Sequence, residues 1–269
     1  MHHRLVDRIT ALNDVPREPL VPRRLGKNMC VPFGKILRGQ VVPNTVTKTL
    51  HTDKVYEPDL NSFKIEPFHY YSPLKSQIET IKSFDRPVIL VDDLVHRADR
   101  LQVLVPQLRE DGIPIRKVVV GVLSGYGRDL MQCLKVPVES IYSMPNLRQW
   151  FVESTLYPFI GGDTVRREEM KVAGLQPSIN MILPYATPRL SGCSREALVE
   201  FSACCIENSK NLFQVLEAEY RKMYAKNLTL SRLSEAVILP LCPDKGSCME
   251  YDENLAASVY LENDLETLW

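Results

Sequence analysis

The sequence contains no long apolar run and no excess of charge of either sign. No stretch approaches the roughly 18 to 20 apolar residues that cross a bilayer, and the first residues lack the apolar core of a signal peptide. The 269 residues include 33 basic and 33 acidic side chains, so the formal net charge is zero. A neutral chain has no general attraction to nucleic acid or anionic lipid. We therefore expect a cytoplasmic protein with no nucleic-acid or membrane partner, in which any anion site is a local cluster.

The sequence also lacks the cysteine spacing of a zinc site or a disulfide scaffold. Its 7 cysteines include no Cys-x-x-Cys pair and no nearby histidine at zinc-ligand spacing. A chain of this length buries a sufficient core without disulfides. We interpret the cysteines as structural thiols of a globular protein that has no internal repeat and no low-complexity segment.

Prolines and charges are frequent in residues 1–44. After a short helical pattern that includes Leu5 and Ile9, this composition predicts an extended N-terminal segment that wraps around the rest. Residues 45–56 alternate between polar and apolar side chains and are rich in β-branched and aromatic residues, which predicts a strand or a strand pair.

Helical and strand patterns alternate from residue 74 onward. Residues 74–84 carry apolar side chains at helical spacing, and residues 88–91, VILV, are typical of a strand covered on both faces. Residues 101–112 predict a further helix and residues 117–123, KVVVGVL, a second buried strand. This order is that of a βαβ unit in a parallel sheet. Further candidate strands are the short apolar runs around Ile141 and at 179–183.

The last third of the chain has a helical pattern. Apolar residues recur at intervals of three, four or seven residues from Ser194 to about Lys226, which predicts a long helix. A second helix follows, capped by Thr229 or Ser231. We predict an α/β fold with a parallel sheet flanked by helices, Rossmann-like, over residues 45–185. A helical C-terminal extension, 186–269, offers an apolar stripe for a homodimer or a partner domain.

Acidic side chains stand where ligands bind in such a fold, at the carboxyl ends of the strands. Asp92 and Asp93 follow strand 88–91, and a carboxylate pair there accepts hydrogen bonds from sugar hydroxyls or holds magnesium. The loop that follows opens a helix, whose first backbone N–H groups favour phosphate. Arg97 and Arg100 add charge-assisted hydrogen bonds to such a ligand.

The segment VILVDDLVHRADR, residues 88–100, resembles the phosphoribosyl-pyrophosphate binding motif of type I phosphoribosyltransferases. The resemblance implies that Asp92 and Asp93 bond the ribose hydroxyls and assist a magnesium ion, which is the cofactor that the family implies. It places the 5-phosphate on the loop and helix start formed by His96, Arg97, Ala98, Asp99 and Arg100.

The same segment departs from the family where phosphate binds. The family carries Thr-Gly and, two residues later, a second Thr, and this chain has Arg97-Ala98 and Arg100 there. Glycine allows the close approach of backbone to phosphate, and threonine supplies hydroxyl donors. Two interpretations stay open: the guanidinium groups replace the hydroxyls, or they occupy the place of the phosphate.

Two flanking groups have a weaker resemblance to the family. Lys48, His51 and Lys54 correspond to a basic segment that reaches the pyrophosphate, and a solvated strand face explains them equally well. Trp150 and Phe151 correspond to aromatic residues that stack against the base, and a buried aromatic core explains them too.

These residues leave two classes of function. The first is an enzyme in which phosphoribosyl pyrophosphate transfers its phosphoribosyl group to a nitrogen acceptor and releases pyrophosphate. The second is a protein that binds or senses a nucleotide or sugar phosphate without transfer, or serves as an accessory domain or subunit. An Asp-Asp pair also holds magnesium in response-regulator and phosphatase-like folds, but the sequence identifies no third acidic group or nucleophile for that chemistry.

Overall fold

The computed structural model describes residues 1–13, 25–57, 59–68, 70–166, 176–188, 192–233, 238–240 and 252–269. These residues form two compact units, each described by itself. Unit 1 consists of Met1–Asp53 and Ile65–Trp150, and unit 2 of Lys54–Lys64 and Phe151–Trp269. Parts of the predicted features lie outside the described residues: the prolines Pro16, Pro19 and Pro22 of the N-terminal segment, Glu235 of the second helix predicted after Lys226, and the cysteines Cys242 and Cys248.

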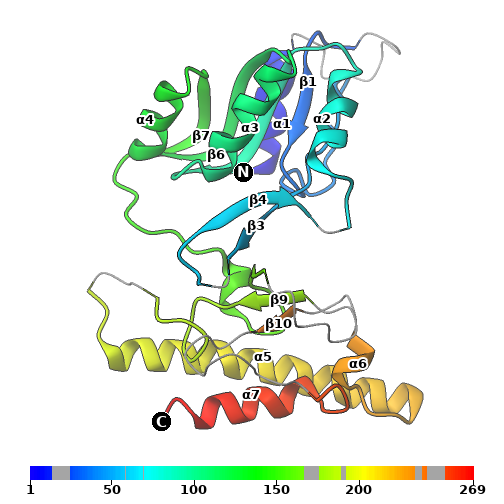
Figure 1. Cartoon of the computed structure of the whole chain (residues 1–269), viewed down its shortest axis with the longest axis vertical. Coiled ribbons are helices and arrows are strands. Elements are labelled where there is room, and N and C mark those ends of the chain that lie inside the picture. Colours follow the sequence, from blue (N-terminus) through cyan, green and yellow to red (C-terminus); the bar gives the residue numbers. More distant parts are fainter. Residues whose placement is uncertain are drawn as a thin grey trace. The chain divides into compact units, whose positions relative to one another are not determined.

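Unit 1 is built on a five-stranded parallel sheet with the order β2-β1-β5-β6-β7 (Figure 1). Its strands are β1 (Met29–Pro32), β2 (Val46–Thr47), β5 (Val88–Val95), β6 (Ile115–Ser124) and β7 (Val138–Met144). The runs VILV and VVV at the centre are almost entirely buried, as strands covered on both faces require. The predicted Rossmann-like α/β fold, with a parallel sheet flanked by helices, is confirmed.

Helices cover both faces of this sheet. On one face, Leu5 and Ile9 of α1 (His2–Leu12) pack against Ile89 and Val91 of β5. On the other face, Val88 and Leu90 of the same strand pack against three helices. These helices are α2 (Leu74–Lys82), α3 (Asp99–Glu110) and α4 (Gly125–Cys133).

The N-terminal part of the chain is more than a wrapping segment. Strand β1 lies within residues 1–44, between β2 and β5, and its four residues MCVP are all buried. A run of four residues next to prolines has no periodicity that distinguishes it from loop, so the sequence did not reveal it. Strand β5 is also longer than residues 88–91: it continues through Asp92 and Asp93 to Val95.

The predicted strand pair at 45–56 divides between two sheets. Strand β2 joins the parallel sheet, whereas β3 (Thr52–Tyr56) pairs with β4 (Phe63–Pro67) in a two-stranded sheet. The division between the units passes through this hairpin. Tyr56 forms a bridge with Val165, and its carbonyl accepts a hydrogen bond from the Arg166 N–H at 2.7 Å, so the hairpin tip belongs to unit 2.

Unit 2 contains a small sheet as well as helices, so residues 186–269 are not a purely helical extension. Its described elements are β8 (Asp163–Thr164), the 3-10 helix η1 (Glu153–Leu156), β9 (Gln176–Ile179), α5 (Arg195–Tyr224), α6 (Leu230–Leu233), β10 (Ile238–Pro240) and α7 (Ala257–Glu266). The run expected at 179–183 overlaps β9 only at its end, and β9 pairs with β8 and β10 rather than with the parallel sheet. The boundary expected at 185 therefore lies at 150.

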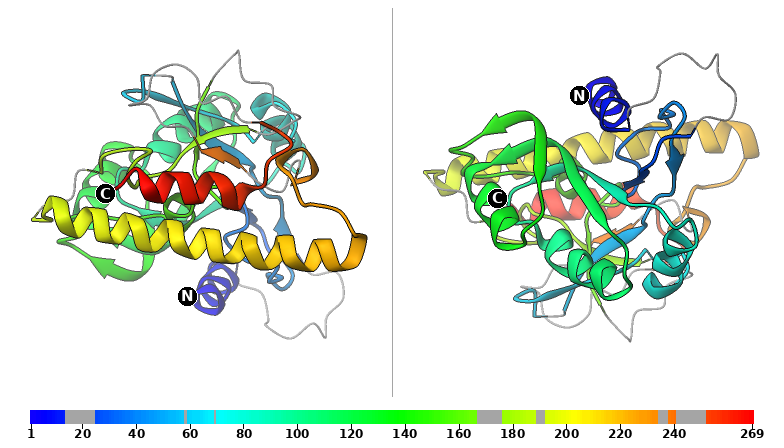
Figure 2. Two further views of the ribbon diagram at one scale, coloured as in Figure 1. Left: turned by 90° about the horizontal axis from the view of Figure 1, so that it is seen from below. Right: turned by 90° about the horizontal axis from the view of Figure 1, so that it is seen from above.

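The long helix predicted from Ser194 is confirmed as α5, which lies beside α7 (Figure 2). One side of α5 packs Phe213 into the core of unit 2, where its ring meets Phe159 edge to face. Large apolar side chains on the rest of α5 are exposed: Phe201, Leu212, Val215, Leu216 and Met223. Association through this helix stays a prediction. In the described parts of the chain, no helix has both the length and the apolar character to cross a membrane.

Candidate functional site

The strand order of unit 1 reverses between β1 and β5. From β1 the chain continues to β2 on one side, and β5 occupies the other side, so the loops after β1 and β5 diverge at the same edge. In open α/β sheets, ligands bind in the crevice at such a switch point, beyond the carboxyl ends of the strands. The N–H of Phe33 donates to the Val91 carbonyl at 3.0 Å, so the loop after β1 begins beside β5.

Asp92 is a buried carboxyl group at this edge. It lies within β5 and is 5 % exposed, whereas Asp93 is exposed. One oxygen, Oδ1, accepts a hydrogen bond from the Asp93 N–H at 3.0 Å and from Arg100 Nη1 at 3.3 Å. Burial raises the pKa of Asp92 to about 7, against the opposing effect of the Arg100 charge and with a further increase from Asp93.

Arg100 connects three elements of the switch point. It lies in the first turn of α3, pairs with Asp92 of β5, and holds its guanidinium over the Phe33 ring, with Cζ 5.3 Å from the ring centroid. Its side chain remains 33 % exposed. A guanidinium held by a carboxylate and an aromatic face is positioned in advance for a charged ligand.

The expected phosphate segment divides into a loop and a helix start. His96, Arg97 and Ala98 form the loop, and Asp99 and Arg100 begin α3. Ala98 adopts a left-handed conformation, with φ of 54°, which glycine adopts without strain. No side chain caps the N-terminus of α3, and Arg97 is exposed. The position where the family has glycine therefore has the backbone that favours glycine.

His96 is held by the neighbouring strand and helix. Its Nδ1 lies 2.9 Å from the Ser124 hydroxyl, which also accepts the Gly127 N–H at 2.9 Å and so caps α4. A Cβ on Gly127 would lie 2.1 Å from the Val95 carbonyl oxygen. Close packing of α4 on β5 thus accounts for the second glycine of the segment Gly125-Tyr126-Gly127. The His96 ring also contacts Tyr126, with centroids 5.8 Å apart.

Lys48 and His51 lie on the other side of β1, after β2. The Leu50 N–H donates to the Pro32 carbonyl at 3.0 Å, which fixes this segment alongside the end of β1. The His51 ring stacks on Tyr71 with centroids 3.6 Å apart. Burial, and then the charges of Lys48 and Lys35, lower the pKa of His51. Two lysines, an imidazole and an aromatic ring therefore gather beside the switch point.

The remaining predicted residues lie at or beyond the division between the two units. Lys54 belongs to unit 2, where its Nζ lies 3.9 Å from the centroid of the Phe63 ring. Trp150 and Phe151 are exposed, and the division between the units falls between them. Tyr157, a third aromatic residue of that region, packs against the core of unit 2. The pairing of these aromatic residues with a base has no geometric support.

Several residues at the switch point were not identified from the sequence. Phe33 and Lys35 follow a strand that the sequence did not reveal, and Tyr71 and Ser124 are far from residues 92–100 in the chain. The order of the strands in the sheet places these residues near one another, and that order is seen only in the folded structure.

The described residues do not form a magnesium cage. Within them, no three His, Cys, Asp or Glu side chains are placed to hold a metal ion. Asp92 is already bonded to Arg100, and Asp93 Oδ1 accepts the Leu94 N–H at 2.8 Å. Each carboxylate of the pair therefore already uses one oxygen in a hydrogen bond within the protein.

Comparisons with known proteins add a structural likeness and no family. No protein-family profile matches the chain, and no curated protein sequence matches it. Among solved structures, TT1426 from Thermus thermophilus is similar at 12 % identity and a TM-score of 0.32, over 55 % of this chain and 86 % of that protein. A similarity of this size carries no inference about ligand or activity.

Proposed function

We propose that unit 1 binds a phosphorylated ribose compound, phosphoribosyl pyrophosphate or a nucleotide, at the switch point between β1 and β5. The observation that carries the proposal is Arg100. Its guanidinium, carried by the first turn of α3, is held by Asp92 of β5 and by the ring of Phe33, the residue that follows β1. A cation at a helix N-terminus is mildly unfavourable by itself, and a bound phosphate reverses that sign.

Each part of such a ligand has partners at this edge. The phosphate meets Arg97, Arg100 and the uncapped start of α3, where backbone N–H groups favour anions. Ribose hydroxyls donate to the carboxylates of Asp92 and Asp93.

A second phosphate and a flat ring have partners beside them. Lys35 and Lys48 supply positive charge close to His51, whose pKa their charges lower. The stacked pair of His51 and Tyr71 offers a flat surface of the kind that nucleobases contact.

Binding is favoured over transfer by the sequence of the loop after β5. The loop lacks the threonine hydroxyls and the glycine that the transferases carry. Transfer remains the second proposal, carried by the resemblance of residues 88–100. In that reaction the bond from ribose C1 to the pyrophosphate oxygen breaks, a bond from C1 to a nitrogen acceptor forms, and pyrophosphate leaves with the electron pair.

Calorimetric titration tests the proposal directly. We expect the full chain to bind phosphoribosyl pyrophosphate, and Arg97→Ala and Arg100→Ala each to weaken binding by about 1.5–3 kcal/mol, the contribution of a charge-assisted hydrogen bond. Arg109→Ala is the matched control, because Arg109 lies at the other end of α3 and donates to the Lys135 carbonyl at 3.0 Å. It should leave the dissociation constant unchanged.

The outcomes separate three cases. Binding without release of pyrophosphate in the presence of purine and pyrimidine bases supports a binding protein, and release supports the transferase. Titrations with and without magnesium show whether the ligand binds as its magnesium complex. Failure of phosphoribosyl pyrophosphate, ribose 5-phosphate and adenosine monophosphate to bind the folded wild type rejects the proposal, as does an equal loss in Arg109→Ala.

A further inference from the structure

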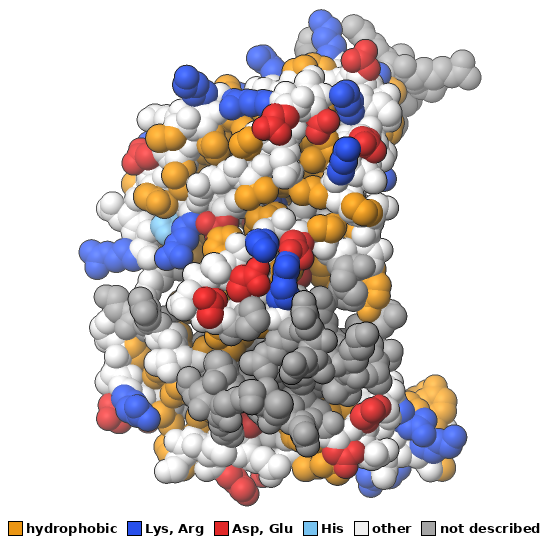
Figure 3. Space-filling model, in the orientation of Figure 1, with side chains coloured by type: hydrophobic (Ala, Val, Ile, Leu, Met, Phe, Trp, Pro, Cys, Tyr) orange, Lys and Arg blue, Asp and Glu red, His pale blue; other side chains and the backbone are white. Residues whose placement is uncertain are grey.

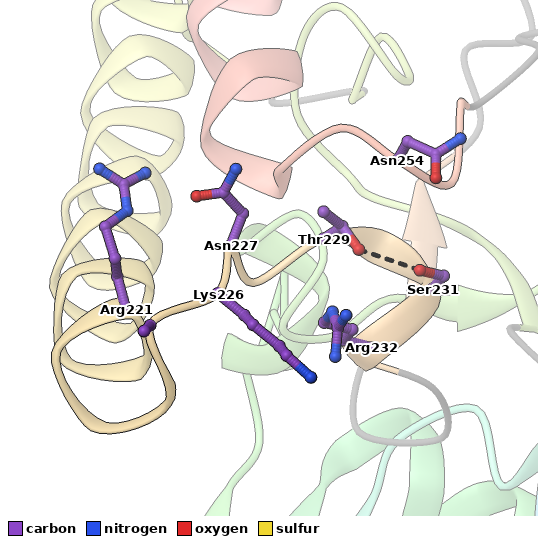
Figure 4. Close-up of a pocket in the computed structure, with 8 residues that line it drawn as sticks. Arg221, Lys226, Asn227, Thr229, Ser231, Arg232 and Asn254 are labelled. Atoms are coloured by element: carbon purple, nitrogen blue, oxygen red, sulfur yellow. Dashed lines mark hydrogen bonds between the residues drawn. The ribbon is translucent and has the colours of Figure 1, made fainter.

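A polar hollow lies in unit 2, at the carboxyl end of α5 (Figure 4). It has a volume of about 500 Å³, within the range of small-molecule sites. It is lined by Arg221, Ala225, Lys226, Asn227, Thr229, Ser231, Arg232 and Asn254. Among the described residues that line it, three side chains are cationic and none is acidic, although the chain as a whole has no net charge.

The turn after α5 gathers these cations. Ala225 ends the helix in a left-handed conformation, with φ of 52°, and the chain reverses there. Arg221 extends from the last turn of α5, while Lys226 and Arg232 extend from the segment that returns (Figure 4). Basic side chains in a last helical turn complement the helix dipole, which explains Arg221. Arg232 lies in the last turn of the short helix α6, and Lys226 lies in the turn between the two helices, where no helix dipole explains it.

The walls of the hollow are held by hydrogen bonds. The Leu230 N–H donates to the Leu255 carbonyl at 2.9 Å, and the Ser231 N–H to the Glu253 carbonyl at 3.0 Å. Arg232 Nη1 donates to the Tyr220 hydroxyl at 3.4 Å, so its guanidinium is oriented by α5. The Thr229 and Ser231 hydroxyls hydrogen bond to each other at 2.9 Å (Figure 4). These hydrogen bonds hold the backbone around the hollow in place and orient the guanidinium of Arg232.

The positive charge is not neutralised by neighbouring carboxylates that the structure describes. Among those residues, no carboxylate oxygen lies within 4.0 Å of the nitrogens of Arg221, Lys226 or Arg232. Asp252, next to the hollow, uses Oδ1 to accept the N–H and Nδ2 of Asn254. By contrast, Lys222 on the same turn of α5 lies 3.7 Å from Glu219.

We propose that this hollow binds an anion that carries two or more phosphate groups. Three cations in one concavity exceed what a single phosphate needs, and guanidinium groups match phosphate oxygens in a bidentate manner. The hydroxyls of Thr229 and Ser231 and the amides of Asn227 and Asn254 supply further hydrogen bonds. This site is separate from the switch point of unit 1, and either proposal stands without the other.

Sodium tripolyphosphate is the probe for this site. At low salt we expect it to slow hydrogen exchange of the amides at 226–232 in the full chain, with orthophosphate binding at least about tenfold more weakly. The double variant Lys226→Gln/Arg232→Gln should abolish that protection. The control Lys210→Gln/Lys222→Gln removes the same charge from residues that pair with Glu262 and Glu219, and should keep it.

The named outcomes decide the proposal. Protection at 226–232 that the first double variant loses and the control retains supports it. It is overturned by unchanged exchange at 226–232, by equal loss in both double variants, or by equal affinity for orthophosphate. Arg97→Ala/Arg100→Ala should leave protection at 226–232 intact, so failure of the unit 1 proposal is read separately.

Discussion

Asp92 is a buried strand residue paired with Arg100, and its neighbour in the chain, Asp93, is exposed. The resemblance assigns both carboxylates to the ribose hydroxyls, and burial gives the first of them a different environment. Burial raises its pKa to about 7, so the folded protein holds a proton there that the unfolded chain releases near its ordinary value of 3.8. Two neighbours in sequence thus have different chemistry because one is buried.

This proton makes stability depend on pH. A raised pKa in the folded state contributes stability that is complete below the unfolded value and is lost as pH rises toward the folded one. We expect the free energy of unfolding of unit 1 to fall between about pH 4 and pH 7 relative to that of Asp92→Asn. His51, whose pKa is lowered, contributes the opposite slope in both proteins and cancels in the difference.

Urea unfolding at several pH values measures that difference. Asp93→Asn is the control, because it removes a neighbouring carboxylate but leaves Asp92 buried, and burial is the largest cause of the shift. It should keep most of the dependence. A wild type and an Asp92→Asn variant that change in parallel over this interval would show that Asp92 ionises normally.

At the scale of elements, the carboxyl edge of the sheet is fixed by the packing of α4. Ser124 ends β6 and caps α4, while Gly127 in the first turn lies against the Val95 carbonyl of β5. Because glycine has no side chain, the first turn of α4 packs directly against the backbone of β5. The His96 imidazole is held by the same serine, so one contact positions both α4 and the loop that leads to Arg97.

Replacement of this glycine tests the contact. Gly127→Ala places a Cβ 2.1 Å from a backbone oxygen, which cannot move without β5, so we expect a loss of more than about 2 kcal/mol in the stability of unit 1. Tyr126→Ala changes the neighbouring residue, whose side chain is 57 % exposed, and should cost less than about 1 kcal/mol. Thermal unfolding of both variants compares them, and equal melting temperatures would contradict the packing role.

At the scale of the whole molecule, the two units are not two consecutive stretches of sequence. Residues 54–64 belong to unit 2 although unit 1 precedes and follows them in the chain. Tyr56 packs against the core of unit 2 and is bonded to Arg166 through its carbonyl. On the face shown in Figure 3, acidic and basic side chains are interspersed, as the zero net charge implies, so charge of one sign gathers only locally.

A substitution within this hairpin should therefore act on unit 2. We expect Tyr56→Ala to accelerate hydrogen exchange in β9 and α5, with a loss of about 2 kcal/mol in local stability, and to leave β5 and β6 unchanged. Ile81→Ala, a buried residue of α2, should have the reverse pattern. Faster exchange in β5 and β6 of Tyr56→Ala would contradict the assignment of the hairpin to unit 2.

Much of the fold followed from local pattern. The run VILV, the helical spacing of residues 74–84 and the long helix from Ser194 were read correctly because periodicity and burial are local consequences of an amphipathic or buried element. Strand β1 and the sheet of unit 2 were missed because strands of two to four residues show no period.

The sequence by itself determined the α/β class, the acidic pair that follows the buried run VILV and the two arginines after it. Only the tertiary structure decided that β1 lies beside β5, which brings Phe33 and Lys35 to the edge where Arg100 meets Asp92. It also placed Lys54 and Phe151 in unit 2 and gathered Arg221, Lys226 and Arg232 around a hollow of that unit. The physical reason is that strand order and burial depend on contacts between residues distant in the chain, which no local pattern encodes.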